Sequence, residues 1–165
     1  MMQRILGIDP GSLSTGYSVI ESDGRTNRYI TSGQINTSSL SAVERLATIY
    51  DGVAEVIETY QPSMMIVEKV FMSKNADSAL KLGQARGVAI CAGVKAGLAV
   101  HEYSARFVKK TITGNGAADK RQVKYMACRL LSIAERDQND ESDALAIALC
   151  HAFATPSDSI SKPHQ

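Results

Sequence analysis

The hydrophobic positions at the start of the chain form short runs of the kind found in strands. Residues 5–8 are all apolar or glycine and are closed by Asp-Pro-Gly at 9–11, which predicts a buried strand followed by a turn. Residues 15–21 and 28–36 alternate loosely between apolar and polar side chains, and the Asp-Gly pair at 23–24 separates them. These patterns predict that the chain begins with an antiparallel meander.

The rest of the chain alternates helical and strand-like patterns. Apolar residues recur at helical spacing from Ser41 to Tyr60, and Glu44 follows a Ser41 cap by three positions. Strands are expected at 64–68 and 98–103, and helices from about 75 to 96, over 104–110, after a cap at Asp119, and from Asp140 to just before Pro156. This order predicts an α/β fold, with a five-stranded mixed β-sheet flanked by α-helices on both faces.

The length and composition predict one domain. We expect residues 1–155 to form it and the polar stretch 156–165 to be a disordered tail. No apolar run is long enough to cross a bilayer or to serve as a signal peptide, so we expect a cytoplasmic protein without a membrane partner. The three cysteines, Cys91, Cys128 and Cys150, lie among apolar residues and are expected to be buried, reduced thiols.

Charge is distributed unevenly although the net charge is only +1. The stretch from Lys69 to Arg129 contains twelve Lys and Arg but three Asp and Glu, and the remaining residues are acidic on balance. Such a chain can bind a polyanion on one face, although the same lysines can also be solvated helix faces.

Four acidic residues from distant parts of the chain are candidates for one site. Asp9 and Glu68 each end an apolar strand, and the helix between them allows a right-handed crossover that makes the two strands parallel. Both side chains then leave the same edge of the sheet, where open α/β sheets bind ligands. Asp140 and Asp143 are three residues apart at the start of the last helix and share one of its faces.

Clustered carboxylates repel one another unless a cation lies between them. Mg²⁺ prefers oxygen ligands, and two such ions ~3.5–4 Å apart can activate a water and stabilise the leaving oxygen of a phosphodiester. Each acid also has a simpler explanation. Asp9 can be a turn residue, Glu68 a strand end, and Asp140 and Asp143 the cap and first turn of a helix.

Further motifs accompany the four acids. In order along the chain they are Ile8-Asp-Pro-Gly11, Glu68-Lys-Val-Phe71, Asn75 to Gly87, Lys109, Lys120 and Asp140-Glu-Ser-Asp-Ala-Leu-Ala146. Together they resemble the RuvC family, bacterial Holliday-junction resolvases with a ribonuclease H-like fold. The resemblance runs from about Arg4 to Ala154, and its most specific part begins at Glu68 and ends at Gly87.

The resemblance implies roles for seven residues. Asp9, Glu68, Asp140 and Asp143 are implied to be the catalytic, metal-binding acids. Lys109 and Lys120 are implied to contact DNA near the scissile phosphate, and Phe71 to stack on or wedge against bases at the crossover. Phe71 can otherwise be a core residue.

The resemblance also implies the reaction and the partners. It implies a Mg²⁺-dependent crossover junction endodeoxyribonuclease that resolves four-way junction DNA in recombination and repair by symmetric paired nicks. Two Mg²⁺ per active site are expected with DNA bound, and Mn²⁺ is an expected substitute. The family further implies a homodimer and the RuvA–RuvB branch-migration complex as a partner.

Small residues at Ala79, Gly83, Gly87 and Cys91 indicate close packing, either on the sheet or on a second subunit.

Three other functions fit parts of the pattern. The turn after Asp9 is also found in actin-like and sugar-kinase-like ATPases, but those enzymes clamp nucleotide between two such domains and this chain has room for one. A non-catalytic junction-binding protein would hold four acids against DNA without a metal, which electrostatics disfavours. A ribonuclease H-like nuclease acting on RNA–DNA hybrids or on other branched DNA is the third alternative.

Overall fold

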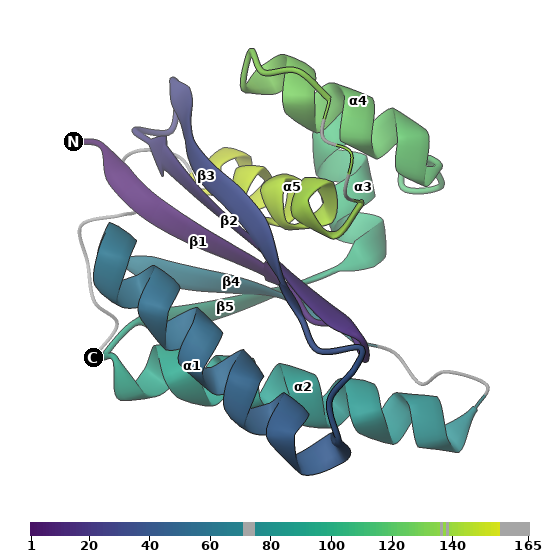
Figure 1. The fold of residues 1–165 in the computed structure, drawn as a ribbon. Coiled ribbons are helices and arrows are strands. Elements are labelled where there is room, and N and C mark those ends of the chain that lie inside the picture. Colours follow the sequence, from purple (N-terminus) through teal and green to yellow (C-terminus); the bar gives the residue numbers. More distant parts are fainter. Residues whose placement is uncertain (71–74, 136, 138, 156–165) are drawn as a thin grey trace.

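The computed structural model describes residues 1–70, 75–135, 137 and 139–155. Its strands are β1 (Gln3–Asp9), β2 (Ser14–Ser22), β3 (Asn27–Asn36), β4 (Met64–Lys69) and β5 (Ala99–Ser104). Its helices are α1 (Ala42–Tyr60), α2 (Ala76–Lys95), α3 (Ala105–Thr113), α4 (Lys120–Leu130) and α5 (Asn139–Ala154) (Figure 1). Phe71 and the stretch 156–165 lie outside the described residues, so the predictions for them stay predictions.

The five strands form one mixed sheet, as predicted, and their order in it is β3-β2-β1-β4-β5. β1 pairs with β2, and β2 with β3, in antiparallel fashion, whereas β1–β4 and β4–β5 are parallel. The crossover through α1 therefore makes β1 and β4 parallel neighbours. Their carboxyl ends lie on the same side of the molecule, at the right in Figure 1.

Helices cover both faces of the sheet (Figure 1). One core lies between the sheet and α3, α4 and α5 and includes Ile5, Ile20 and Ile66. The other lies between the sheet and α1 and α2 and includes Leu6, Ile8, Val19 and Val67. Successive strand residues point to opposite faces, so the odd residues of β1 and the even residues of β2 and β4 face α5. The α/β class with helices on both faces is confirmed.

Side-chain caps explain where several helices begin. Ser41 and Glu44 form the expected capping box at α1, and Asp119 forms one with Gln122 at α4. α5 begins at Asn139, so Asp140 lies within the first turn of the helix and is not its N-cap. The helix that carries the predicted acidic pair therefore starts where the sequence indicates, to within one residue.

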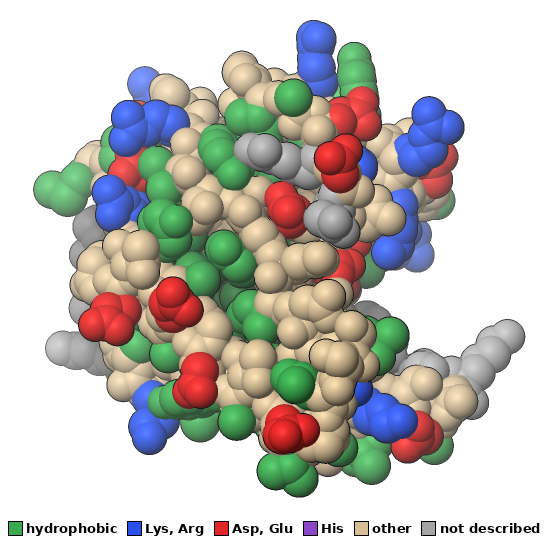
Figure 2. Space-filling model, viewed as in Figure 1, with side chains coloured by type: hydrophobic (Ala, Val, Ile, Leu, Met, Phe, Trp, Pro, Cys, Tyr) green, Lys and Arg blue, Asp and Glu red, His purple; other side chains and the backbone are tan. Residues whose placement is uncertain are grey.

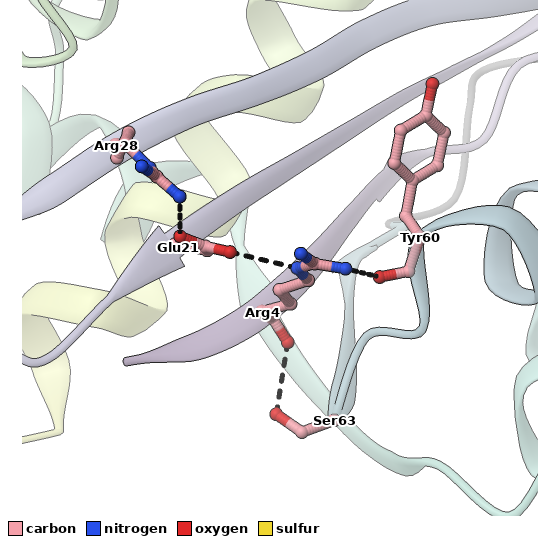
Figure 3. A network of polar contacts seen from close by, with 5 residues as sticks. All are labelled: Arg4, Glu21, Arg28, Tyr60 and Ser63. Atoms are coloured by element: carbon pink, nitrogen blue, oxygen red, sulfur yellow. Dashed lines mark hydrogen bonds and ion pairs between the residues drawn. The ribbon is translucent and has the colours of Figure 1, made fainter. Parts of the chain in front are cut away.

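A polar network joins the amino-terminal ends of β1 and β4 (Figure 3). Arg4 donates to Glu21 on β2 at 3.0 Å and to the carbonyl of Tyr60 at 2.8 Å. Arg28 on β3 binds the other oxygen of Glu21 at 2.5 Å, and Ser63 donates to the Arg4 carbonyl at 3.1 Å. These contacts link the first three strands to the end of α1 and the start of β4, which stabilises the register of the central pair.

Two glycines and the cysteine of α2 do not pack against the rest of the fold. A Cβ atom built on Gly83 or on Gly87 would meet nothing within 4 Å, so these glycines do not pack on the sheet. Cys91 is exposed, so the prediction that it is buried is wrong, whereas Cys128 and Cys150 are buried free thiols. Gly83, Gly87 and Cys91 thus face outward, whereas Ala85 and Ala89 of the same helix are buried. Within the described residues, no helix is both long enough and apolar enough to cross a membrane.

Candidate active site

Asp9 and Glu68 meet at the carboxyl ends of β1 and β4. The parallel register pairs Ile8 with Val67, so the residues that follow lie side by side, Asp9 as the last residue of β1 and Glu68 as the last but one of β4. Strand alternation directs both side chains toward α5, because Ile8 and Val67 are buried in the opposite core. The sequence-based expectation that these two acids leave the same sheet edge is therefore met by the register.

Glycines in β1 and β2 allow α5 to lie directly on the strand backbones. A Cβ atom on Gly7 would lie 2.3 Å from the carbonyl oxygen of Ala144, and one on Gly16 would lie 2.1 Å from that of Asp140. Ser18 Oγ donates to the same Ala144 carbonyl at 2.8 Å in a buried hydrogen bond. A larger side chain at either glycine would push the helix away. This close seating brings the start of α5 to the strand ends that carry Asp9 and Glu68.

A cavity of about 190 Å³ lies at this junction of β1, β4, α3, α4 and α5. The residues that line it are Asp9, Glu68, Ala105, Val108, Lys109, Lys120, Val123, Asp143, Ala146 and Ile147. Five of the seven residues named from the sequence thus surround one cavity. Asp140 is not among the lining residues, and Phe71 lies outside the described ones.

The acids of this cavity perturb one another strongly. Burial, followed by the charges of Asp143, Glu68 and Asp140, raises the pKa of Asp9 from 3.8 to about 8. The pKa values of Glu68 and Asp143 are also raised, in each case chiefly by burial. The negative charge of Asp140 thus acts on Asp9 although its side chain does not line the cavity. Perturbed carboxyls of this kind are characteristic of functional sites.

Two lysines supply positive charge at the mouth of the cavity. Lys120 Nζ lies 3.5 Å from Asp143 Oδ2, and this carboxylate is the main cause that raises the pKa of Lys120. The Lys120 side chain is 79% exposed, so the ion pair is open to solvent and leaves the ammonium free to meet an anion. Lys109, from α3, lines the same cavity and its charge favours the ionised forms of Glu68 and Asp143.

The donor set suits a hard divalent cation. The carboxylates of Asp9, Glu68 and Asp143 line the cavity, and a carboxyl as buried as Asp9 is costly to ionise without a compensating positive charge. In the part of the chain that the structure describes, no three Asp, Glu, His or Cys side chains are arranged as they lie so that they could hold a metal ion. Cation binding would therefore draw the carboxylates closer together.

Two polar contacts of α5 had no signal in the sequence. Ser14, the first residue of β2, donates its hydroxyl to Asp140 Oδ2. Ser32 on β3 donates to Glu141 Oε2 at 3.0 Å, so Glu141 points away from the cavity. Ser14 is 126 residues from Asp140, and only the completed sheet brings the two together.

A mixed sheet in this strand order, with acids at the ends of its central parallel strands and a further acidic pair on the helix that crosses them, defines a ribonuclease H-like protein. A solved structure described as Thermus thermophilus RuvC in complex with Holliday junction substrate is similar to this chain at a TM-score of 0.86 and 34% identity. The match covers 92% of this chain and 94% of that one.

Comparison of sequences gives the family. The family model described as crossover junction endodeoxyribonuclease RuvC matches residues 5–151. Relatives of that name from Stutzerimonas stutzeri and Vibrio campbellii are 58% and 54% identical over 151 residues, which cover 92% of this chain and 87% of each relative. The chain belongs to the RuvC family of crossover junction endodeoxyribonucleases.

Proposed function

We propose that this chain is a Mg²⁺-dependent endonuclease that resolves four-way DNA junctions by paired, symmetric nicks. The observation that carries the proposal is the cavity in which Asp9, Glu68 and Asp143 meet beneath Lys109 and Lys120. Metal-assisted phosphodiester hydrolysis needs acidic side chains that bind the cations and basic side chains that bind the phosphate. The similarity to a RuvC structure solved with a Holliday junction substrate supports the choice of substrate.

Each group in the site has a distinct part in this proposal. When bound, two Mg²⁺ supply an activated water and stabilise the leaving oxygen. Asp9, Glu68, Asp140 and Asp143 hold these ions and orient them against the strand. Lys109 and Lys120 bind the phosphates beside the scissile bond and keep the backbone over the cavity. Phe71, the third residue after Glu68, is proposed to stack on a base at the crossover.

Positive charge at the cavity supports its side of the molecule as the DNA surface. Lys109 on α3 and Lys120 on α4 line the cavity beside the acids, and the Lys120 side chain is 79% exposed. On the face shown in Figure 2, acidic side chains are scattered across the middle and Lys and Arg lie mostly toward the outline, so the middle of that face would not attract a polyanion. We therefore propose that the junction lies against α3, α4 and the strand ends.

A homodimer is part of the proposal because a four-way junction presents two equivalent strands. A C₂ dimer would place one cavity on each of them, so that paired nicks follow from symmetry. The outward-facing stripe of α2, with Gly83 and Gly87 and the exposed Leu80 and Val94, is the surface proposed for this contact. The RuvA–RuvB complex is proposed as a further partner from family membership alone.

The direct test is incubation of the purified chain with a synthetic four-way junction, with Mg²⁺ and with a chelator. We expect two nicks at symmetric positions with Mg²⁺ and none with the chelator. A linear duplex and an RNA–DNA hybrid of the same sequence are the substrate controls. Faster cutting of the hybrid than of the junction would overturn the proposed substrate.

Lys120→Ala should weaken junction binding and reduce its salt dependence. Each phosphate contact that is lost lowers the slope of log K against log salt by roughly 0.9. The measurement is junction affinity at several salt concentrations in the presence of a chelator. Lys95→Ala, at the far end of α2, is the matched control because it removes the same charge away from the cavity. An identical slope for the two variants would exclude a phosphate contact by Lys120.

A further inference from the structure

Asp140 differs from the other acids because a hydroxyl already holds its side chain. Asp9, Glu68 and Asp143 line the cavity, whereas Asp140 stands outside the lining. Its Oδ2 accepts a hydrogen bond from Ser14 Oγ, and both residues are half-buried. This is a hydrogen bond from a neutral donor to a charged acceptor, which is stronger than one between neutral groups. One carboxylate oxygen is thereby fixed, and the other keeps its lone pairs.

The position of Ser14 does not depend on its own side chain. The Thr37 backbone N–H and side-chain hydroxyl both donate to the Leu13 carbonyl, at 2.9 and 3.0 Å. Arg45 donates to the Ser12 carbonyl at 2.6 Å, and Ser14 itself pairs with Asn36 on β3. The backbone that leads into β2 is therefore held on both sides. A change of the Ser14 side chain should alter the contact with Asp140 without moving the strand.

The backbone of α5 is fixed separately from the Asp140 carboxylate. The close approaches at Gly7 and Gly16 and the hydrogen bond from Ser18 set how the helix lies on β1 and β2. None of them restricts the rotation of the Asp140 side chain about its own bonds. Ser14 is the partner that the structure shows for that carboxylate. The hydroxyl thus determines which way Asp140 presents its free oxygen.

We propose that Ser14 is a positioning residue for cation binding, because its hydroxyl holds Asp140 Oδ2 and leaves the second oxygen available to a cation beside Asp9 and Asp143. This inference rests on the proposed function, since it assumes that Asp140 is a metal ligand. Ser14 itself neither binds the cation nor touches the substrate. Its effect is to preorganise the ligand, so its loss should weaken cation binding and slow the chemical step.

The test compares Ser14→Val with Ser14→Thr. The two side chains have nearly the same shape and the same strand preference, but only threonine keeps the hydroxyl. Loss of a hydrogen bond to a charged group changes an equilibrium constant by roughly 10-fold or more. We therefore expect Ser14→Val to lower kcat and the affinity for Mg²⁺ about 10-fold. In Ser14→Thr, which keeps the hydroxyl, kcat and the affinity for Mg²⁺ should stay within about 2-fold of the values of the natural chain. The KM for the junction should be unchanged in both variants.

A second readout avoids catalysis. The Mg²⁺-dependent rise in melting temperature should be smaller for Ser14→Val than for Ser14→Thr, while both melt alike in chelator. In an Asp140→Asn background, the difference between valine and threonine should disappear. Equal metal response of the two variants, or a difference that persists without the Asp140 carboxylate, would overturn the proposal. If Asp140→Asn alone cuts normally, the proposed role of Asp140 in the reaction fails, and the Ser14 inference fails with it. If Asp140→Asn loses cutting but the valine and threonine variants respond equally to Mg²⁺, only the Ser14 inference fails.

Discussion

Asp140→Asn should reduce junction cleavage by at least about 1,000-fold, because several kcal/mol of metal-ion catalysis are lost and each 1.4 kcal/mol is tenfold in rate. The substitution keeps the size of the side chain and removes the charge that the cation would meet. Junction binding in chelator should be equal or tighter, since one negative charge near the phosphates is gone. The measurements are single-turnover cleavage with Mg²⁺ and a binding titration without it.

Glu141→Gln is the matched control for this prediction. It removes the same charge from the next residue of the same helix turn, but Glu141 points to Ser32 on β3 and away from the cavity. We expect near-normal cleavage from this variant. A similar loss in both variants would show that net charge at the start of α5, and not the Asp140 carboxylate, controls the reaction.

Asp9→Asn should stabilise the metal-free protein, and by more as the pH rises. The pKa of Asp9 is 3.8 as an ordinary carboxyl and about 8 in the fold, so the folded chain binds the proton more tightly. The natural chain therefore loses folding stability as the pH rises from about 4 to about 8. At about 1.4 kcal/mol per pKa unit, the free energy of unfolding falls by roughly 4 to 6 kcal/mol. The asparagine variant does not show this fall, because its side chain does not ionise.

Urea unfolding in chelator from pH 5 to pH 9 measures this difference. The gap in unfolding free energy between the variant and the natural chain should be small at pH 5 and widest at pH 9. Addition of Mg²⁺ at pH 9 should stabilise the natural chain far more than the variant, because binding to the folded state adds stability. A gap that does not change with pH would mean that Asp9 is neither buried nor close to other acids.

The pairing of Asp9 with Glu68 could be predicted because it follows from local rules. Two apolar runs that each end in an acid, with a helix between them, give parallel strands and a shared edge. The helix faces of Asp140 and Asp143 follow from their spacing. These rules operate over a few residues at a time. The structure agrees with the first, because Asp9 and Glu68 both line the cavity, but of the helical pair Asp143 lines it and Asp140 does not.

Contacts between distant segments could not be predicted in the same way. The Ser14 hydroxyl contacts Asp140 because Gly16 allows α5 to approach β2 closely. No pattern in the sequence around either residue predicts this contact. The sequence alone also leaves the orientation of α2 open, for a related reason. Helical spacing identifies a stripe of small residues, but only the packed fold shows that Gly83 and Gly87 face outward.

The seating of α5 on β1 and β2 has a consequence for biosynthesis. Asp9 and Glu68 precede the two acids of α5 by more than seventy positions in the order of translation. A nascent chain that ends at α4 lacks α5, so the core that includes Ile5, Ile20 and Ile66 has not yet received the helix that covers it. The folding step that covers this core is therefore also the step that brings Asp140 and Asp143 to the edge of the sheet.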